Sequence, residues 1–231
     1  MTNPQQAYAI IVAGGTGARM RSVVPKQFLL LNERPVLMHT IDAFYNCGTK
    51  PQIILVLHAD FHTYWQQLCT RYNFKTPHQL VKGGETRFHS VKNGIDLIPN
   101  DIAAVIAIQD AVRPLTSKQI IDEAYNHALE HGNAIVAVKS RDSVRQLKND
   151  RSTSLVRDEI YLVQTPQTFK SAQLKRAYEQ PYNSNFTDDA SVVEQSGVAI
   201  NIVNGSYRNI KITFPEDIAI AEAILNEKPS A

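Results

Sequence analysis

Five short apolar runs, rich in β-branched residues, recur along the chain and constrain its fold more than any other feature. Each holds five or six residues with almost no polar side chain, which is typical of strands buried on both faces of a sheet. The runs are Tyr8–Ala13, Gln52–Leu57, Ala103–Ile108, Ala134–Val138 and Ala199–Val203. Because segments with helical spacing lie between them, we expect an α/β fold with a mainly parallel, twisted sheet and helices on both faces.

Two of the intervening segments carry clear helical signals. Residues 120–128 place five apolar side chains on one face, namely Ile120, Ile121, Ala124, Tyr125 and Ala128. Near the end of the chain, Pro215 followed by Glu216 and Asp217 is typical of a helix start. In that second helix Ile218, Ala221 and Ile224 share one face, with Leu225 near the end.

The stretch from Lys139 to Val163 breaks the alternation of strand and helix. It is rich in Arg, Lys and Asp, with only short apolar pieces between them. We therefore expect an extended arm or hairpin that leaves the core. The sequence contains no repeat, low-complexity tract or linker, so we predict one domain over residues 1–231 with residues 139–163 as an excursion.

Composition narrows the class of protein. With 231 residues, 43% of them hydrophobic and 20% charged, the chain can bury a full core. Its 24 Lys and Arg against 22 Asp and Glu give a net charge of +2, which does not favour non-specific nucleic-acid binding. The sequence shows no signal peptide and no bilayer-spanning run, so we expect a cytoplasmic protein with no membrane partner. Cys47 and Cys69 lie outside any CxxC pattern, which favours buried thiols over a disulfide or metal site.

A glycine-rich loop follows the first apolar run. Gly14, Gly15 and Gly17 let backbone N–H groups approach an anion closely, and Arg19 and Lys26 add two cations nearby. This combination predicts a cradle for a triphosphate.

Two familiar phosphate-binding motifs do not fit this loop. A dinucleotide fingerprint requires a third glycine where the chain has Met20. A P-loop requires Gly-Lys-Ser/Thr, whereas Lys26 is flanked by Pro25 and Gln27.

The segments AGGTGARM (13–20) and PKQFLLLNERPVLMHTIDAF (25–44) resemble the opening of the 2-C-methyl-D-erythritol 4-phosphate cytidylyltransferases of isoprenoid biosynthesis. The related ribitol-5-phosphate cytidylyltransferases open similarly. The resemblance continues in order over nearly the whole chain, through GGETRFHSV (83–91), QDAVRP (109–114), RDSVR (141–145), QTPQTF (164–169), FTDDAS (186–191) and NIKITFPEDI (209–218).

The resemblance implies a Rossmann-like nucleotidyltransferase fold and a divalent cation, usually Mg²⁺. It also implies a homodimer in which residues 139–163 form a dimerisation arm that crosses to the partner, so that each site is shared. The implied reaction joins CMP from CTP to 2-C-methyl-D-erythritol 4-phosphate and releases pyrophosphate. In such a reaction the protein mainly holds two polyanions together and neutralises charge in the transition state.

The same resemblance assigns residues to CTP. Arg19 and Lys26 are implied to contact its phosphates and the transition state, and Gly84, Glu85 and Ser90 to read the cytosine ring. Asp110 is implied to lie beside the ribose and the metal-bound phosphates, and is the one candidate metal ligand. The loop residues assigned to the nucleotide are Ala13, Gly14, Gly15, Thr16 and Gly17. Ser90 also has the simpler interpretation of a serine on a helix face, and Arg87 that of a structural residue.

A second set is implied to hold the acceptor, with Arg157 and Lys211 clamping its phosphate and acting in catalysis. The others are Arg113, Ser143, Thr165 and Thr187. For Arg113 a salt bridge to Asp110 is an equal alternative. Asp188 and Asp189 are interpreted as caps of a helix through 191–195 rather than as metal ligands.

One position departs from the family, because Gln109 stands where His is common. An amide cannot titrate, so any proton role there is in doubt. Three other functions stay open on the sequence. They are transfer of CMP to ribitol 5-phosphate, transfer of GMP or UMP, and binding of a nucleotide without catalysis.

Overall fold

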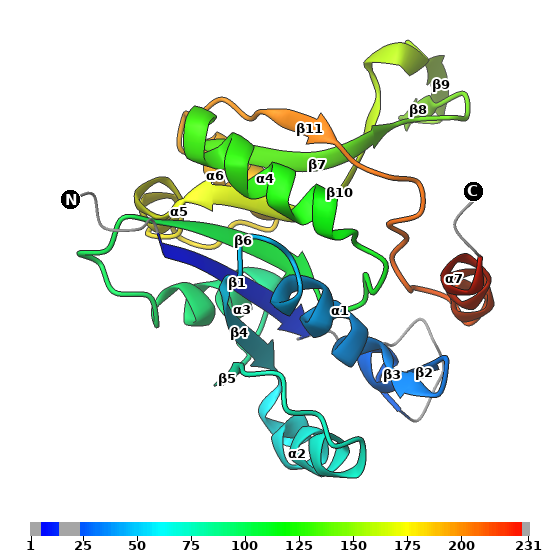
Figure 1. Ribbon diagram of the computed structural model, residues 1–231. Coiled ribbons are helices and arrows are strands. Elements are labelled where there is room, and N and C mark those ends of the chain that lie inside the picture. The colour runs from blue at the N-terminus through cyan, green and yellow to red at the C-terminus, as the bar shows by residue number, and fades with distance from the viewer. Residues whose placement is uncertain (1–5, 14–23, 228–231) are drawn as a thin grey trace.

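The computed structural model describes residues 6–13 and 24–227, which form a layered α/β domain around a seven-stranded sheet (Figure 1). Its strand order is β11-β7-β10-β6-β1-β4-β5. All neighbours pair in parallel except the two pairs made by β10. The strands are β1 (Gln6–Ala13), β4 (Gln52–Leu57), β5 (Gln79–Lys82), β6 (Ala104–Asp110), β7 (Asn133–Lys139), β10 (Tyr161–Lys170) and β11 (Ile202–Asn204). The mainly parallel sheet is thus confirmed.

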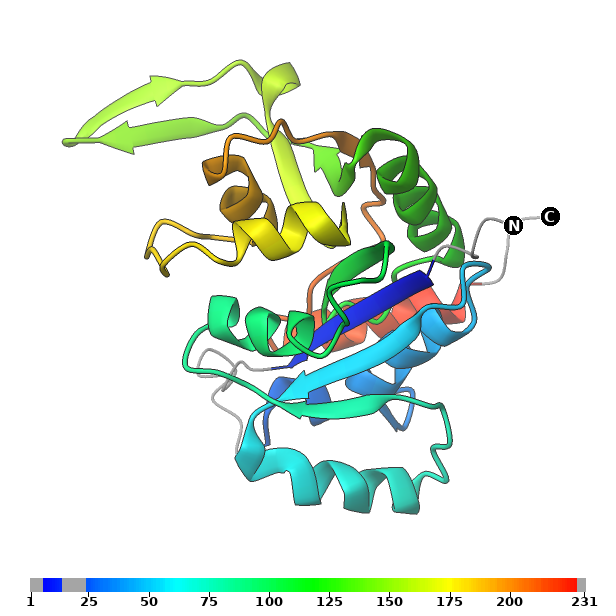
Figure 2. The same cartoon turned by 90° about the vertical axis from the view of Figure 1, so that its left-hand side faces the viewer.

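Helices cover both faces of this sheet, as Figure 2 shows. On one face α1 (Val36–Tyr45), α2 (His62–Arg71) and α4 (Lys118–His131) pack against alternate strand residues such as Ala9 and Ile11 of β1. On the other, α3 (Arg87–Ile95), α5 (Ser171–Ala177) and α6 (Asp189–Gln195) pack against Tyr8 and Ile10. Successive side chains of a strand point to opposite faces, so each face has its own apolar core.

Four of the five apolar runs are sheet strands close to the predicted bounds, and the fifth is only partly so. The prediction of a strand over 199–203 was wrong at its start, because β11 begins at Ile202. The side chain of Asn133 accounts for the difference. Its Nδ2 donates to the carbonyl of Ala199 at 2.9 Å, and its Oδ1 accepts from the N–H of Asn201 at 2.8 Å.

The two predicted helices are both present, and they differ in how deeply they are buried. In α4 all five predicted side chains are buried, and Ser117 caps the helix by accepting from the N–H of Ile120. The last helix, α7 (Glu216–Asn226), begins directly after Pro215, but only Ala221 on it is buried. Of the other residues predicted to share its apolar face, Ile218 and Ile224 are partly buried and Leu225 is exposed. This helix packs on the hairpin of β2 (Leu30–Leu31) and β3 (Arg34–Pro35) rather than on the sheet.

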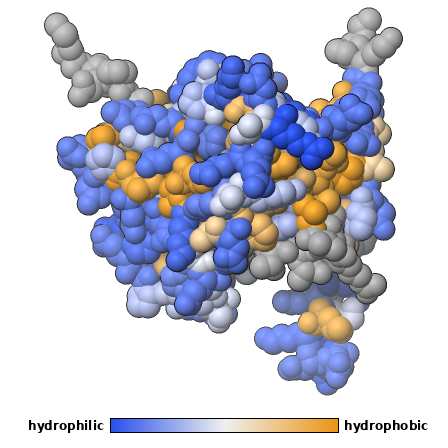
Figure 3. Space-filling model, turned by 90° about the horizontal axis from the view of Figure 1, so that it is seen from below, coloured by the Kyte–Doolittle hydropathy of each residue, from blue (hydrophilic) through white to orange (hydrophobic). Residues whose placement is uncertain are grey.

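The excursion is a β-hairpin that stands clear of the domain (Figures 1 and 2). Its strands are β8 (Arg145–Lys148) and β9 (Arg151–Ser154), exposed along their whole length. Asn149 and Asp150 between them both have positive φ, which is typical of a tight two-residue hairpin turn. In Figure 3 the arm is the separate lobe at the lower right, largely hydrophilic with one apolar patch. The predicted hairpin is confirmed.

Both cysteines are free, as predicted, with Cys47 buried and Cys69 partly exposed. Burial raises the pKa of the Cys69 thiol to about 11. Within residues 6–13 and 24–227, no helix combines the length and the apolar character that crossing a membrane requires.

Candidate active site

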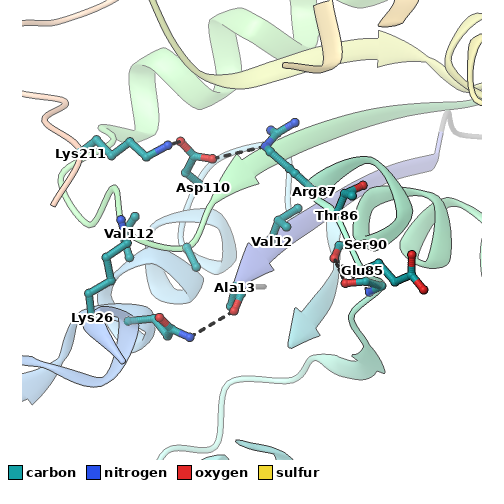
Figure 4. Close-up of a pocket in the computed structure, with 13 residues that line it drawn as sticks. Val12, Ala13, Lys26, Glu85, Thr86, Arg87, Ser90, Asp110, Val112 and Lys211 are labelled. Carbon is teal, nitrogen blue, oxygen red and sulfur yellow. Dashed lines mark hydrogen bonds and ion pairs between the residues drawn. The ribbon is translucent and has the colours of Figure 1, made fainter. Parts of the chain in front are cut away.

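Two cavities adjoin at the carboxyl end of β6, and three charged side chains belong to both. The first is a cleft of about 410 Å³ that extends from β1 to α3, and Figure 4 shows its lining. The second, of about 310 Å³, lies between the end of β6, β10 and the residues before α6. Arg87, Asp110 and Lys211 line both. Ligands of parallel α/β sheets bind outside the carboxyl ends of the strands, which is where these cavities lie.

The Asp110 carboxylate is the centre of this arrangement, at the last residue of β6. Lys211 Nζ lies 2.8 Å from its Oδ2, Arg113 Nε lies 3.4 Å from the same oxygen, and Arg87 Nε lies 3.8 Å from Oδ1. Burial alone would raise the pKa of Asp110, but the cations Arg87, Lys211 and Arg113 outweigh it and lower the pKa to about 2. The carboxylate is therefore ionised at neutral pH and surrounded by positive charge, which suits a site for phosphates.

Arg87 is a functional candidate that sequence reasoning treated only as structural. It is the first residue of α3, and its guanidinium makes a bidentate pair with Asp189, at 2.7 Å and 2.5 Å. Tyr178 donates its hydroxyl to the same carboxylate at 2.7 Å. Although burial opposes the charge, Asp189 and Asp110 raise the pKa of Arg87, which stays a cation. Arg87 thus links the core to the point where the two cavities meet.

Lys211 and Arg113 reach the cluster from two loops that are joined by backbone bonding. The N–H of Ile212 donates to the carbonyl of Val112 at 2.9 Å, which holds the loop of Lys211 against the loop after β6. Arg113 both pairs with Asp110 and lines the second cavity. The salt bridge that the sequence offered as an alternative for Arg113 is therefore present, and the residue still faces a cavity.

At the nucleotide end, the cleft contains several of the predicted residues. Lys26, on a 3₁₀ turn over Lys26–Phe28, and Ala13 line it, and the side chain of Gln27 fixes the two segments by donating to the Ala13 carbonyl at 3.1 Å. Gly84, Glu85 and Ser90 line it as well. The predicted residues Gly14, Gly15, Thr16, Gly17 and Arg19 lie outside the described residues.

Ser90 does more than occupy a helix face. It is buried on α3, and its Oγ accepts from the N–H of Gly84 at 3.0 Å, so it fixes the loop before the helix. A side chain at Gly84 would place its Cβ 2.8 Å from the backbone carbonyl carbon of His89, so only glycine fits this close approach. The carboxylate of Glu85 points away from Asp110 in Figure 4.

The predicted acceptor residues fall into two groups. Thr165, Thr187, Arg113 and Lys211 line the second cavity. Thr165 accepts from the N–H of Asp110 at 3.1 Å, which joins β10 to the end of β6. Ser143 and Arg157 instead belong to the exposed arm and line neither cavity of their own chain. Arg157 makes an exposed pair with Asp158 at 3.7 Å.

The directions of three more side chains decide the roles that the sequence left open for Gln109, Asp188 and Asp189. Gln109 is buried and donates to Thr116 and to the carbonyl of Arg113, so it faces the core and not the cavities. Asp188 caps α6 through a capping box with Ser191, as predicted. Asp189 does not cap this helix, because its buried carboxylate pairs with Arg87.

Metal ligands are sparse in the part of the chain that the structure describes. No three His, Cys, Asp or Glu side chains there are close enough to hold an ion together. Among the described residues that line both cavities, Asp110 is the one with a carboxylate. One carboxylate suits Mg²⁺ that is bound chiefly through substrate phosphates and water.

Comparison with known proteins places this geometry in context. The model of the family described as 2-C-methyl-D-erythritol 4-phosphate cytidylyltransferase (IspD) matches residues 7–227. A protein of that name from Azobacteroides pseudotrichonymphae is 47% identical, over 96% of this chain and 100% of its own length. One from Bacteroides fragilis is 46% identical, over 94% and 98%.

Solved structures agree in fold. The crystal structure of 4-diphosphocytidyl-2C-methyl-D-erythritol synthase from Anaerococcus prevotii superposes with a TM-score of 0.82 at 28% identity, covering 96% of this chain and 97% of that one. The 2-C-methyl-D-erythritol 4-phosphate cytidylyltransferase of Francisella tularensis gives a TM-score of 0.77 at 31% identity, covering 95% and 99%.

Proposed function

Because the chain belongs to the 2-C-methyl-D-erythritol 4-phosphate cytidylyltransferase family, we propose that it transfers CMP from CTP to 2-C-methyl-D-erythritol 4-phosphate and releases pyrophosphate. The observation that supports this most is the junction of the two cavities at Asp110. Predicted nucleotide residues such as Lys26, Gly84 and Ser90 line one cavity, and four of the predicted acceptor residues line the other. Two bound phosphorylated molecules would therefore meet beside Arg87 and Lys211.

The transfer requires in-line displacement at the α-phosphorus of CTP. A phosphate oxygen of the acceptor forms a bond to this phosphorus, the bond from the α-phosphorus to the bridging oxygen breaks, and pyrophosphate leaves with the electron pair. In this proposal Lys26, with Arg19, neutralises the triphosphate, and Lys211 orients the acceptor phosphate. Such positioning and charge neutralisation supply most of the catalysis in phosphoryl chemistry.

Mg²⁺ is the cation that we propose for this reaction. It would be held by Asp110 and by oxygens of the triphosphate, and it would neutralise charge on the phosphates. The ammonium of Lys211, now 2.8 Å from the carboxylate, would then exchange its partner for the acceptor phosphate.

The arm is proposed to complete the site of a second subunit. Its exposed apolar side chains, Leu147 at 71% and Val156 at 63%, suit burial in a dimer. Arg157 lines neither of the two cavities described for its own chain, so in this proposal its acceptor role depends on a neighbouring copy. A complementation experiment tests this arrangement. Lys26→Ala chains, which have a low kcat, and Arg157→Ala chains, which have a raised acceptor KM, should regain activity at low acceptor concentration when they are mixed under conditions that allow subunit exchange, because one site in the mixed dimer is intact.

A panel assay tests the proposed reaction and its alternatives together. Pyrophosphate release would be measured with CTP, UTP and GTP against 2-C-methyl-D-erythritol 4-phosphate and ribitol 5-phosphate, with and without Mg²⁺. We expect release with CTP, the methylerythritol acceptor and Mg²⁺. A preference for ribitol 5-phosphate or for another nucleotide would replace the proposed substrates, and CTP binding without release would indicate a binding module. A cytoplasmic location stays a prediction from the sequence.

A further inference from the structure

Asn209 is fully buried, and each polar group of this residue has a hydrogen-bond partner. Its Nδ2 donates to Oε1 of Gln164 at 3.1 Å and to the carbonyl of Thr165 at 2.9 Å, and its Oδ1 accepts from the hydroxyl of Thr116 at 2.8 Å. Because a backbone carbonyl can only accept, the contact with Thr165 fixes which way the amide points.

The backbone of Asn209 takes part as well. Its carbonyl accepts from Nη1 of Arg113 at 2.8 Å, and its N–H donates to the carbonyl of Ser206 at 3.0 Å. This one residue therefore joins three segments: the loop of 205–211, β10, and the loop after β6.

Two of the groups so joined belong to the second cavity. Arg113 lines it and pairs with Asp110, and Lys211, two residues after Asn209, lines it and reaches Asp110 at 2.8 Å. Tyr207 and Arg208, just before Asn209, are held by contacts at the exposed surface, whereas Ile210 is partly buried against an apolar cluster and the Ser206 carbonyl accepts from Gln164 at 2.8 Å. Tyr207 donates to the carbonyl of Lys139, and Arg208 pairs with Glu227 of the chain end. Together with the backbone bond from Ile212 to Val112 and the packing of Ile210, the buried amide of Asn209 ties this loop to the core beside the site.

We propose that Asn209 is a positioning residue for acceptor transfer, holding Lys211 and Arg113 in register with Asp110. The proposal rests on the proposed function for its kinetic readout. Replacing the amide leaves Thr116, Gln164 and the Thr165 carbonyl without their shared partner, and the loop is then free to shift. Binding of the acceptor should weaken, whereas binding of the nucleotide at Lys26, Gly84 and Ser90 should not.

The experiment compares Asn209→Ala and Asn209→Asp with a matched control, Asn133→Ala. Asn133 is also a buried asparagine that joins two segments through both halves of its amide, but it lies on β7 outside both cavities. We expect the Asn209 variants to raise KM for the acceptor about tenfold or more, with KM for CTP changed by less than about threefold. Asn133→Ala should leave both KM values near those of the parent, even if it lowers Tm as much as the Asn209 variants do.

A double-mutant cycle separates positioning from simple loss of stability. In a Lys211→Ala background the rise in acceptor KM caused by Asn209→Ala should be smaller than in the parent, because one of the two groups that Asn209 positions is already absent, whereas the full rise should remain in a Ser90→Ala background. The proposal would be overturned if the effects of Asn209→Ala and Lys211→Ala on acceptor KM simply multiplied in the double variant. It would also be overturned if Asn133→Ala raised acceptor KM as much as Asn209→Ala does.

Amide hydrogen exchange without any substrate supplies a readout that does not depend on the reaction. The Ile212 amide, which is bonded to Val112, should exchange faster in Asn209→Ala than in the parent. Its exchange rate should not change in Asn133→Ala. Unchanged protection at Ile212 would overturn the positioning role. An inactive parent protein with this exchange pattern intact would instead contradict the proposed function and leave the loop anchoring supported.

Discussion

Lys211 Nζ lies 2.8 Å from Oδ2 of Asp110, although one residue belongs to a loop before the last helix and the other ends a central strand. This pair marks the boundary between the two cavities. A polyanion that enters either cavity meets the same ammonium group. If the two substrates occupy these cavities as proposed, Lys211 lies where their phosphates meet.

Lys211→Ala should raise KM for 2-C-methyl-D-erythritol 4-phosphate far more than KM for CTP, and Arg157→Ala should do the same from the arm. The reason is that both are assigned to the acceptor phosphate and neither to the triphosphate. Steady-state kinetics with each substrate varied in turn would check this. Equal changes in both KM values would refute the assignment of these two residues.

Lys26→Ala should lower turnover at least about a hundredfold, which is roughly 2.7 kcal/mol of transition-state stabilisation. Lys26 lines the first cavity, and in the proposed mechanism its charge stabilises the leaving pyrophosphate. Lys92→Ala is the control, since Lys92 makes only an exposed pair with Asp96 on α3. A Lys26 variant with near-normal kcat would remove this residue from the mechanism.

Ser90→Ala should raise KM for CTP by about tenfold and weaken the preference for CTP over UTP, with little change for the acceptor. Without the hydroxyl, the Gly84 N–H loses its acceptor and the loop that faces the nucleotide loosens. Competition kinetics with CTP and UTP would measure the preference. If selectivity stays unchanged in a folded variant, Ser90 and Gly84 do not read the base.

Arg87→Ala should destabilise the fold by about 3–5 kcal/mol, because it leaves the buried Asp189 carboxylate unpaired. The exposed pair of Lys92 and Asp96 should contribute less than about 1 kcal/mol by comparison. Urea unfolding of Arg87→Ala and Lys92→Ala gives both values in one experiment. A similar fall in the free energy of unfolding of the two variants would contradict the stabilising role given to Arg87.

Stability should depend on pH through Asp110. Its pKa is lowered from the usual 3.8 to about 2, so its stabilising contribution is fully present above about pH 4 and is lost as the pH falls through about 2. Lys211→Ala removes one of the three cations and should move this loss to higher pH. Unfolding of the parent, Lys211→Ala and Asp110→Asn between pH 2 and 5 would test it, with the parent and Asp110→Asn converging toward low pH. Parallel curves for these two proteins would show that Asp110 does not titrate in this window.

Much of this molecule could be predicted from sequence because buried strands and phosphate sites leave strong local patterns. The apolar runs predicted most of the sheet, and the charged stretch over 139–163 predicted a hairpin outside the core. The motif residues that line a cavity, such as Lys26, Ser90 and Lys211, could be named because they lie in short segments similar to a family.

The remaining features depend on which way a side chain points in three dimensions. Asp188 and Asp189 look equivalent as helix caps, yet one caps α6 and the other turns inward to Arg87. Gln109 and Asp110 are neighbours on one strand, so they face opposite sides, and only Asp110 faces the cavities. Asn209 lies in one of the segments similar to the family, but its role could not be predicted, because its side chain bonds to residues of β10 and of the loop after β6, far away in the sequence.

Following the α-phosphorus of CTP tests the central claim most directly. The protein would be mixed with Mg²⁺, 2-C-methyl-D-erythritol 4-phosphate and CTP labelled at that phosphorus, and the products separated. The account predicts that the label moves to the cytidine diphosphate derivative of methylerythritol, with one pyrophosphate released for each labelled product. Label that stays in CTP, or that appears as free CMP, would contradict it.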